Sequence, residues 1–287
     1  MVTKSDITNT LNQLCVKNGD VLLFHSSLKS FGIVDGGADT VIDAVLDTVL
    51  PNGTAVVPTL VQKNFKDAYK TWNKHTSPSD VGFITETFRL RKNALRSDQE
   101  THSVSAIGKH AEEITSTHKS SFPRHHAYGE YAFSTGSPWQ KIYELNGKVL
   151  FMGVDDLKVN TFRHFVEALY TERIISLLDK KDKDEFLNLL VTHSLLEEHT
   201  RQVQEENNGG KKHTLIRFQF GWPMTDKTFP KSCEIKKAYC GNSLFTLMNV
   251  KDFVDGLLEC VINNPENYYD KDVLFWISKA NKNRLIY

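Results

Sequence analysis

The sequence predicts an α/β fold: a central, mostly buried mixed sheet flanked by helices, with an inserted helical segment. Three observations support this prediction. Short continuous apolar runs, typical of strands covered on both faces, alternate with amphipathic segments of helical period. Asn-Gly and Pro-Asn-Gly turns separate several of these segments. A charged stretch of helical period at 177–204 interrupts the alternation, and we interpret it as the insertion.

The composition is that of a globular protein and excludes several classes. The chain has 287 residues, 35 Lys+Arg against 35 Asp+Glu and 40% hydrophobic residues, which excludes whole-chain disorder, collagen and coiled coil. The zero net charge gives no general reason to expect nucleic acid or an anionic membrane as partner, and the basic residues do not interleave with aromatic ones along one stripe of the molecule. An apolar run of the ~18 residues that a spanning helix needs is absent, as is a signal-like N-terminus. We therefore expect a cytoplasmic protein.

The first quarter of the chain predicts two helices and two strands. Ser5 and Asp6 begin an amphipathic helix that Asn18-Gly19 ends. A buried strand follows at 21–24. Gly36-Gly37 begins a second helix, and a turn leads from it into a strand at 54–57.

The remaining elements are predicted from the same signals. The irregular stretch 59–80 is expected to be a lid or binding loop, because long loops in compact domains are often functional. Ser137-Pro138 is a helix start with Pro at the first helical position. The other expected elements are helices at 83–90, 107–118, from 160 and at 250–262, strands at 148–153 and 214–220, and a short apolar run at 273–277.

The four cysteines are too sparse for a disulfide framework. Cys15 and Cys260 lie in apolar helical patterns. We expect both to be inert, buried core residues.

Three predicted strand ends carry polar residues into loops. These are His25-Ser26-Ser27, Thr101-His102-Ser103, and Asp155-Asp156 leading to His164. Ligands of α/β sheets bind where loops leave the strand ends, so we expect all three to meet at one cleft. A hydrogen-bonded structural role remains an equal alternative for His25. A turn is the more common role of a pair such as Gly36-Gly37, and exposure of helix N–H groups to a phosphate is the alternative.

His164 and Glu167 are three residues apart on a predicted helix and therefore share a face. A carboxylate beside an imidazole fixes its tautomer and raises its basicity, as a general base requires. From spacing alone, an ordinary surface ion pair on a helix is the favoured alternative. His125-His126 does not predict a metal, because adjacent side chains diverge and no ligand triad of usual spacing surrounds them. The Walker, G-x-S-x-G and Rossmann motifs are also absent, which disfavours kinase, hydrolase and dehydrogenase functions.

Several ordered segments together resemble the aminoglycoside 3-N-acetyltransferase family of coenzyme A-dependent N-acyltransferases. The resemblance is good over about 1–175 and looser beyond. The matching segments are 19–32, 36–41, 53–59, 96–97, 102–108, 136–139, 143–150 and 160–167.

The resemblance implies one acyltransferase domain over 1–287, with a CoA-binding and catalytic core at about 1–175. The part at about 176–287 would supply the helical insert and complete the core. The co-substrate would be acyl-CoA, with an acetyl or longer acyl group, and no metal would take part. The residues implied to hold CoA are His25, Ser26, Ser27, Leu28, Lys29, Ser30, Gly36, Gly37, Ser103 and Val104.

The same resemblance implies the catalytic residues. His164 would remove the proton of the acceptor amine, and Glu167 or Asp156 would orient the His164 ring. His102 is the fourth residue implied to be catalytic. Family members often carry an aspartate six residues before this histidine, and here that position is Lys158. The departure keeps open a second class of function, a non-catalytic scaffold that binds CoA.

Charge guides the expectation for the acceptor. Aminoglycosides are polycations, and an enzyme that binds them benefits from an acidic cleft. The sequence pI is about 7.2, and basic residues occupy the expected cleft loops. We therefore expect a less cationic amino sugar, such as a nucleotide-linked one; aminoglycoside acetylation giving antibiotic resistance is the alternative, and a homodimer is left open. The basic loop residues are Lys63, Lys66, Lys70, Lys74, Arg124 and Lys158.

Overall fold

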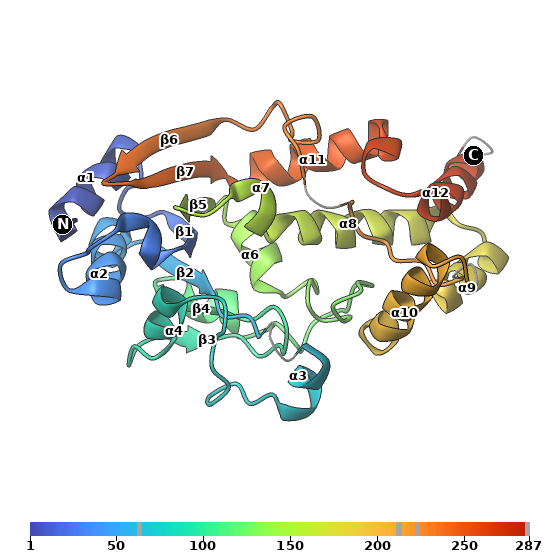
Figure 1. Ribbon diagram of the computed structural model, residues 1–287, viewed down its shortest axis with the longest axis horizontal. Helices are drawn as coiled ribbons and strands as arrows, with labels where there is room; N and C mark the ends of the chain where they lie inside the picture. The colour runs from blue at the N-terminus through green and yellow to red at the C-terminus, as the bar shows by residue number, and fades with distance from the viewer. Residues whose placement is uncertain (62–64, 211–213, 222–223, 285–287) are drawn as a thin grey trace.

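The computed structural model describes residues 1–61, 65–210, 214–221 and 224–284 and shows a seven-stranded mixed sheet between helices (Figure 1). The strand order is β3-β4-β2-β1-β5-β7-β6. β1 pairs in parallel with β2 and β5, whereas the other pairings are antiparallel. The predicted fold class is thereby confirmed. The strands are β1 Val21–Ser26, β2 Thr54–Pro58, β3 Leu95–Arg96, β4 Val104–Gly108, β5 Lys148–Met152, β6 Ile235–Cys240 and β7 Ser243–Asn249.

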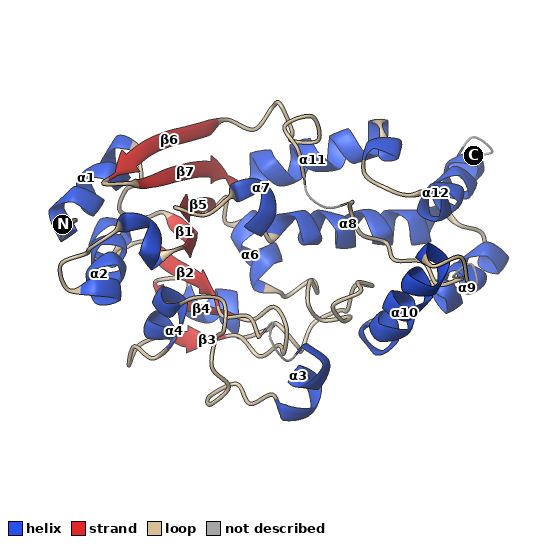
Figure 2. Cartoon of the chain, viewed as in Figure 1, coloured by secondary structure: helices blue, strands red, loops and turns tan. Residues whose placement is uncertain are grey.

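Helices cover both faces of the sheet (Figure 2). The α-helices are α1 Lys4–Gln13, α2 Gly37–Val49, α3 Phe65–Thr71, α4 Phe83–Arg89, α5 Ala111–Thr115, α6 Pro138–Glu144, α7 Asp156–Val159, α8 Phe162–Leu177, α9 Lys180–Leu189, α10 Leu196–Asn207, α11 Val250–Asn263 and α12 Lys271–Arg284. Short 3-10 helices are η1 Leu28–Phe31, η2 His193–Leu195 and η3 Pro265–Asn267.

Alternate side chains of each strand enter two different cores. Leu22 and Phe24 of β1 pack with α1, α2 and α4 on one face. Leu23 packs on the other face with residues of α5, α6, α8 and α11. Because both faces of β1 are covered, its sequence is a continuous apolar run rather than an alternating one.

The sheet topology also fixes where loops can meet. The parallel strands β1, β2 and β5 end at one edge of the sheet. β4 runs antiparallel to β2, with Val104 opposite Pro58, so the residues that precede β4 reach the same edge. The polar residues that were predicted at three strand ends therefore come from loops at one edge.

The N-terminal helix is correctly placed but capped differently from the prediction. Thr3, rather than Ser5, is its N-cap and makes a capping box with Asp6. The prediction for Cys15 is wrong: the helix ends before it, and Cys15 is exposed with φ of 63°. Cys260 is half-buried against the larger core, so it is only partly the core residue expected.

Several elements of the second half differ from the prediction. The residues expected as one helix at 107–118 form the end of β4 and the five-residue α5. The segment 214–220 makes only an isolated bridge between Leu190 and Ile216 instead of a strand. The β6–β7 hairpin was not predicted, and the apolar run 273–277 lies within α12.

The charged stretch 177–204 is interrupted into α9 and α10 (Figure 1). These helices lie at the end of the molecule opposite α1 and α2. The ring of His193, on η2 between them, lies 3.7 Å from the ring of Tyr69, so the segment between α9 and α10 contacts α3 in the region after β2. Among the described residues, the helices are each too short or too polar to cross a membrane.

Gly108, the last residue of β4, is expected to tolerate no side chain. Its φ is +132°, and an added Cβ would meet the Gly53 carbonyl oxygen and lie 2.7 Å from the Thr54 Cα. We expect Gly108→Ala to lower the free energy of unfolding by about 2–5 kcal/mol, because backbone on the neighbouring strand must move.

Gly209 provides the matched control. It also has positive φ, +77°, but an added Cβ would meet nothing within 4 Å. Gly209→Ala should lower the free energy of unfolding by about 1–2 kcal/mol, because only the backbone conformation disfavours a side chain there. Urea unfolding measures both variants, and equal losses would contradict the packing argument.

Candidate active site

A cavity of about 580 Å³ opens at the sheet edge where the three loops meet. His25 and Ser26 at the end of β1 form one wall, and Thr101 and His102 before β4 form another. His164, near the start of α8, also lines the cavity. The structure thus brings together one predicted residue or more from each of the three strand ends.

His164 and Glu167 form a hydrogen-bonded pair on the first turns of α8. The Nδ1 atom of His164 lies 2.7 Å from Oε2 of Glu167. The side chain of His164 is 18% exposed, whereas that of Glu167 is 0% exposed. Because a carboxylate can only accept, Nδ1 carries the proton, and Nε2 is left as the basic atom. The pair is therefore half-buried beside a cavity, unlike an ordinary surface ion pair.

Glu167 receives two further hydrogen bonds. His126 Nε2 lies 3.0 Å from the same oxygen, Oε2, and the backbone N–H of Phe220 donates to Oε1 at 2.9 Å. Burial alone would raise the pKa of Glu167, but the imidazole of His164 and these hydrogen bonds hold it well below its ordinary value. Glu167 is therefore a buried, ionised acceptor that three segments share.

The sequence analysis did not include His126 or Phe220 in the site. His126 was considered only as a metal ligand beside His125, and 214–220 only as a strand. Nothing in the spacing links either residue to Glu167, because they are 41 and 53 residues away from it. The only signal was the occurrence of two histidines in a loop rich in Gly and aromatic residues.

A cluster of three possible metal ligands is formed by His126, His164 and Glu167. Each residue offers one ligand atom, and the three atoms lie within 4.8 Å of one another. Both nitrogen-to-oxygen distances, 2.7 and 3.0 Å, are those of hydrogen bonds rather than of atoms around a shared zinc ion. Each nitrogen needs its proton to make that contact. The arrangement therefore fits a hydrogen-bond network.

His25 and Ser26 present polar atoms that the described chain leaves without a hydrogen-bond partner. These atoms are His25 Nε2 and Ser26 Oγ. The imidazole of His25 stacks on Phe151 at 5.2 Å, and burial lowers its pKa to about 3. His25 is thus neutral at physiological pH and can offer an uncharged hydrogen bond.

His102 packs in one cluster of rings with His164 and with Tyr128 and Phe133 of the 122–136 loop. Its ring is 6.2 Å from that of His164 and 4.9 Å from that of Tyr128. The Nδ1 atom contacts Thr101 Oγ1 at 2.9 Å. Burial, together with the neighbouring imidazoles, lowers the pKa of His102 well below its ordinary value, so it also is neutral.

The other residues implied to hold CoA lie outside the lining of this cavity. Ser103 is fully buried, and its hydroxyl donates to the Thr59 carbonyl at 3.0 Å; Val104 is buried in the sheet. Ser30 bonds the Ser27 carbonyl at 2.7 Å within η1. Lys29 on η1 and Gly36 before α2 are exposed, Leu28 packs partly against a core, and Gly37 begins α2.

Asp156 does not orient His164 in this structure, because the carboxylate on Nδ1 is that of Glu167. Asp156 lies in the first turn of α7. Burial and the nearby Asp155 raise its pKa, and Lys237 opposes them.

The basic cleft expected from the loops is also largely absent. Lys158 lines the cavity, but Arg124 points to the Phe133 carbonyl and Lys74 lines a separate hollow. Lys70 is exposed on α3. Lys63 and the side chain of Lys66 lie outside the described residues. Only one lysine of the described set therefore faces the cavity.

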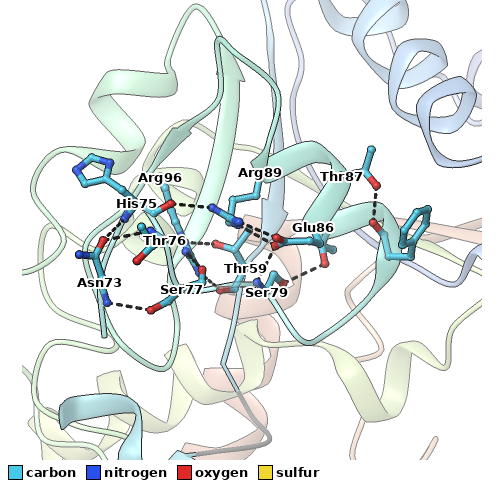
Figure 3. A network of polar contacts seen from close by, with 12 residues as sticks. Thr59, Asn73, His75, Thr76, Ser77, Ser79, Glu86, Thr87, Arg89 and Arg96 are labelled. Carbon is cyan, nitrogen blue, oxygen red and sulfur yellow. Dashed lines mark hydrogen bonds and ion pairs between the residues drawn. The ribbon is translucent and has the colours of Figure 1, made fainter. Parts of the chain in front are cut away.

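Arg96 fixes the 73–79 loop, which lies outside the lining of the cavity (Figure 3). Its guanidinium donates to the Thr59 carbonyl at 2.8 Å and to the Ser77 carbonyl, and it lies 4.4 Å from the centre of the Trp72 ring. Figure 3 also shows Glu86 of α4 reaching the same loop, where it accepts from the backbone N–H of Ser79 at 2.7 Å. These contacts hold the 73–79 turn against β2 and α4.

Comparison with known sequences identifies relatives of the chain. A sequence profile of the family described as aminoglycoside 3-N-acetyltransferase matches residues 23–260. Aminoglycoside N(3)-acetyltransferase III of a Salmonella species is 34% identical over 185 residues, 59% of this chain and 61% of that protein. The SPbeta prophage-derived aminoglycoside N(3')-acetyltransferase-like protein YokD of Bacillus subtilis is 33% identical over 173 residues, 53% and 60% of the two chains. The chain thus aligns with about three fifths of the length of these curated relatives.

Solved structures share the fold. The apoenzyme of aminoglycoside acetyltransferase AAC(3)-IVa superposes with a TM-score of 0.63 at 20% identity, covering 98% of both chains. YokD from Bacillus subtilis gives 0.60 at 22% identity, with 92% of this chain and 95% of that one covered. AAC-IIIb, solved as a binary complex with CoASH, gives 0.61 at 19% identity, with 91% and 97% covered.

The buried neutral histidines predict a loss of stability in acid. Burial lowers the pKa from 6.5 to about 3 for His25 and to about 4 for His118. A group whose pKa falls on folding contributes its full stability above pH 6.5 and loses it as the pH falls toward the folded value. Each of these two histidines should therefore lower the free energy of unfolding by about 2 kcal/mol at pH 5, because the loss is roughly 1.4 kcal/mol for each pH unit below 6.5.

Urea unfolding at pH 7.5 and pH 5 measures this difference. We expect His118→Asn to reduce the difference in free energy of unfolding between the two pH values by about 2 kcal/mol. Substitution of the exposed His75 by Gln is the control and should leave that difference unchanged. Equal free energies of unfolding at the two pH values would show that these histidines are not buried as neutral groups.

Proposed function

Because the chain belongs to the aminoglycoside 3-N-acetyltransferase family, we propose that it is a CoA-dependent N-acyltransferase that acylates an amine of an amino sugar. The observation that carries the proposal is the His164–Glu167 pair at 2.7 Å beside a cavity of about 580 Å³. The names of the relatives and the CoASH complex of a structural neighbour support the same reaction class.

His164 acts as the general base in this proposal. The acceptor amine attacks the thioester carbonyl while Nε2 of His164 takes its proton. The tetrahedral intermediate then expels CoA as a thiolate, which takes that proton from the His164 imidazolium and leaves as the thiol. Glu167 fixes the Nδ1–H tautomer and stabilises the imidazolium that forms. His102, neutral and 6.2 Å from His164, packs beside the base.

His25 and Ser26 face the developing oxyanion. Both residues line the same cavity as His164, and their side-chain atoms Nε2 and Oγ are buried without a hydrogen-bond partner among the described residues. Neutral donors already fixed in place stabilise an oxyanion without reorganising in the reaction. The rest of CoA would extend over η1 and the start of α2, with Ser27 to Ser30 and the Gly36-Gly37 turn beside it.

The names of the relatives make an aminoglycoside the first acceptor class to test. A second candidate is a less cationic amino sugar, such as a nucleotide-linked one. It is favoured by the cavity itself: the described lining residues include Lys158 and lack Asp and Glu. Among these described residues an aminoglycoside would meet no carboxylate to balance its ammonium groups, and the neighbouring Asp155 carboxylate is already paired with Lys158 at 2.9 Å.

Removal of the base should stop turnover without preventing CoA binding. We expect His164→Ala to lower kcat by about 10²–10⁴-fold, the usual contribution of a general base. The affinity for acyl-CoA, measured by calorimetry, should stay within about twofold of wild type, because the base acts on the amine.

His110 and Glu113 provide a control pair with the same spacing. Their atoms are 2.8 Å apart on the surface, and His110 does not line the cavity. His110→Ala should leave kcat unchanged. Full activity of His164→Ala with every acceptor would refute the general-base assignment.

Acceptor charge can be tested by reversing Lys158. We expect Lys158→Glu to raise kcat/KM for polycationic acceptors and to lower it for phosphorylated amino sugars, each by roughly 3–10-fold, as for a charge at the rim of a site. Steady-state assays with both acceptor classes measure the effect. Lys271→Glu, at the start of α12, is the control and should change neither.

The wild-type enzyme decides between the two acceptor classes in the same assays. A clear preference for kanamycin-like acceptors would overturn the second candidate and leave the first.

A further inference from the structure

We propose that His126 is a positioning residue for the catalytic base, acting through Glu167. This inference rests on the proposed function, because it assigns a role beside the base proposed there. His126 lies in the 122–136 loop, outside the helix that carries His164 and Glu167. Its side chain is 0% exposed and does not line the cavity, so it cannot touch a substrate bound there.

The backbone fixes the tautomer of His126. Its Nδ1 atom accepts the N–H of Tyr128 at 3.2 Å, so the ring proton must be on Nε2. That proton points to Oε2 of Glu167, 3.0 Å away. The ring is also held by Phe133, 4.8 Å away in a T-shaped contact. His126 is therefore a rigid single donor aimed at one carboxylate oxygen.

The same oxygen accepts the Nδ1–H of His164. Oε1 is already bonded by the Phe220 N–H, so the three donors together hold the carboxylate in one orientation. Without His126, Oε2 would keep only its bond to His164, and carboxylate and imidazole could rotate together. A fixed carboxylate keeps Nε2 of His164 aimed at the cavity.

A neutral donor suits this place better than a cation would. Burial lowers the pKa of His126, so the ring carries no charge when it binds Glu167. A lysine in its place would neutralise the carboxylate and weaken its attraction for the imidazolium of His164. The guanidinium of Arg163 already faces this carboxylate, with Nε 3.9 Å from Oε1. The uncharged imidazole of His126 therefore fixes the position of Glu167 without adding a second cation beside it when His164 takes a proton.

Two substitutions separate positioning from packing. His126→Leu keeps much of the volume and removes the donor, and we expect kcat to fall about 10–100-fold, as for other supporting hydrogen bonds. KM for the acceptor and affinity for acyl-CoA should stay within about twofold. His126→Gln places an amide N–H near the position of Nε2 and should recover most of the kcat.

A double-mutant cycle tests whether His126 acts through Glu167. In the Glu167→Gln background, His126→Leu should cost less than about twofold more, because the acceptor it serves has changed. A full additional loss in that background, or equal kcat losses for His126→Leu and His126→Gln, would overturn the proposal. If His126→Leu does not fold, His126→Asn, whose donor is too short to reach Oε2, takes its place.

A spectroscopic readout is independent of turnover. In protein labelled with ¹⁵N-histidine, the Nδ1 proton of His164 should give a low-field signal that His126→Leu shifts or broadens and His126→Gln retains. An unchanged signal in His126→Leu would refute the positioning role. Absence of transfer by the wild type to any amine would instead refute the proposed function, while the signal still decides the role of His126.

Discussion

The buried carboxylate of Glu167 is the interaction on which the rest of the site depends. Removing an ionised carboxylate from water costs several kcal/mol, and only well-placed donors offset that cost. Here the donors come from α8, from the 122–136 loop and from the segment 214–221, through His164, His126 and the N–H of Phe220. One side chain therefore ties α8 to two loops that are far apart in the sequence.

The sheet supplies the second constraint, because strand direction decides which loops can meet. β1, β2 and β5 are parallel and end at one edge, and antiparallel β4 begins there. Four buried histidines, His25, His102, His118 and His126, lie around this edge or behind it with lowered pKa values. The site is consequently rich in neutral imidazoles, with Glu167 as a buried negative charge.

The acceptor side of the cavity is where family and local chemistry point in different directions. Relatives carry aminoglycoside names, yet the described lining residues offer one lysine and no carboxylate. The charge argument from the sequence was based on six basic loop residues, of which Lys158 alone faces the cavity among those described. The second candidate, a less cationic acceptor, therefore rests on the absence of Asp and Glu among the described lining residues more than on added positive charge.

The sequence by itself determined the α/β class, the apolar strands β1, β2 and β5, and the His164–Glu167 pair, because these follow from local periodicity and i, i+3 spacing. It did not reveal the β6–β7 hairpin, in which Lys236, Lys237 and other polar residues weaken the strand pattern at an exposed edge. Nor could it place His126 or the N–H of Phe220 on Glu167, or show that Asp156 lies elsewhere. Those contacts join residues 41 and 53 positions apart, and only the packed chain brings such donors to one buried oxygen pair.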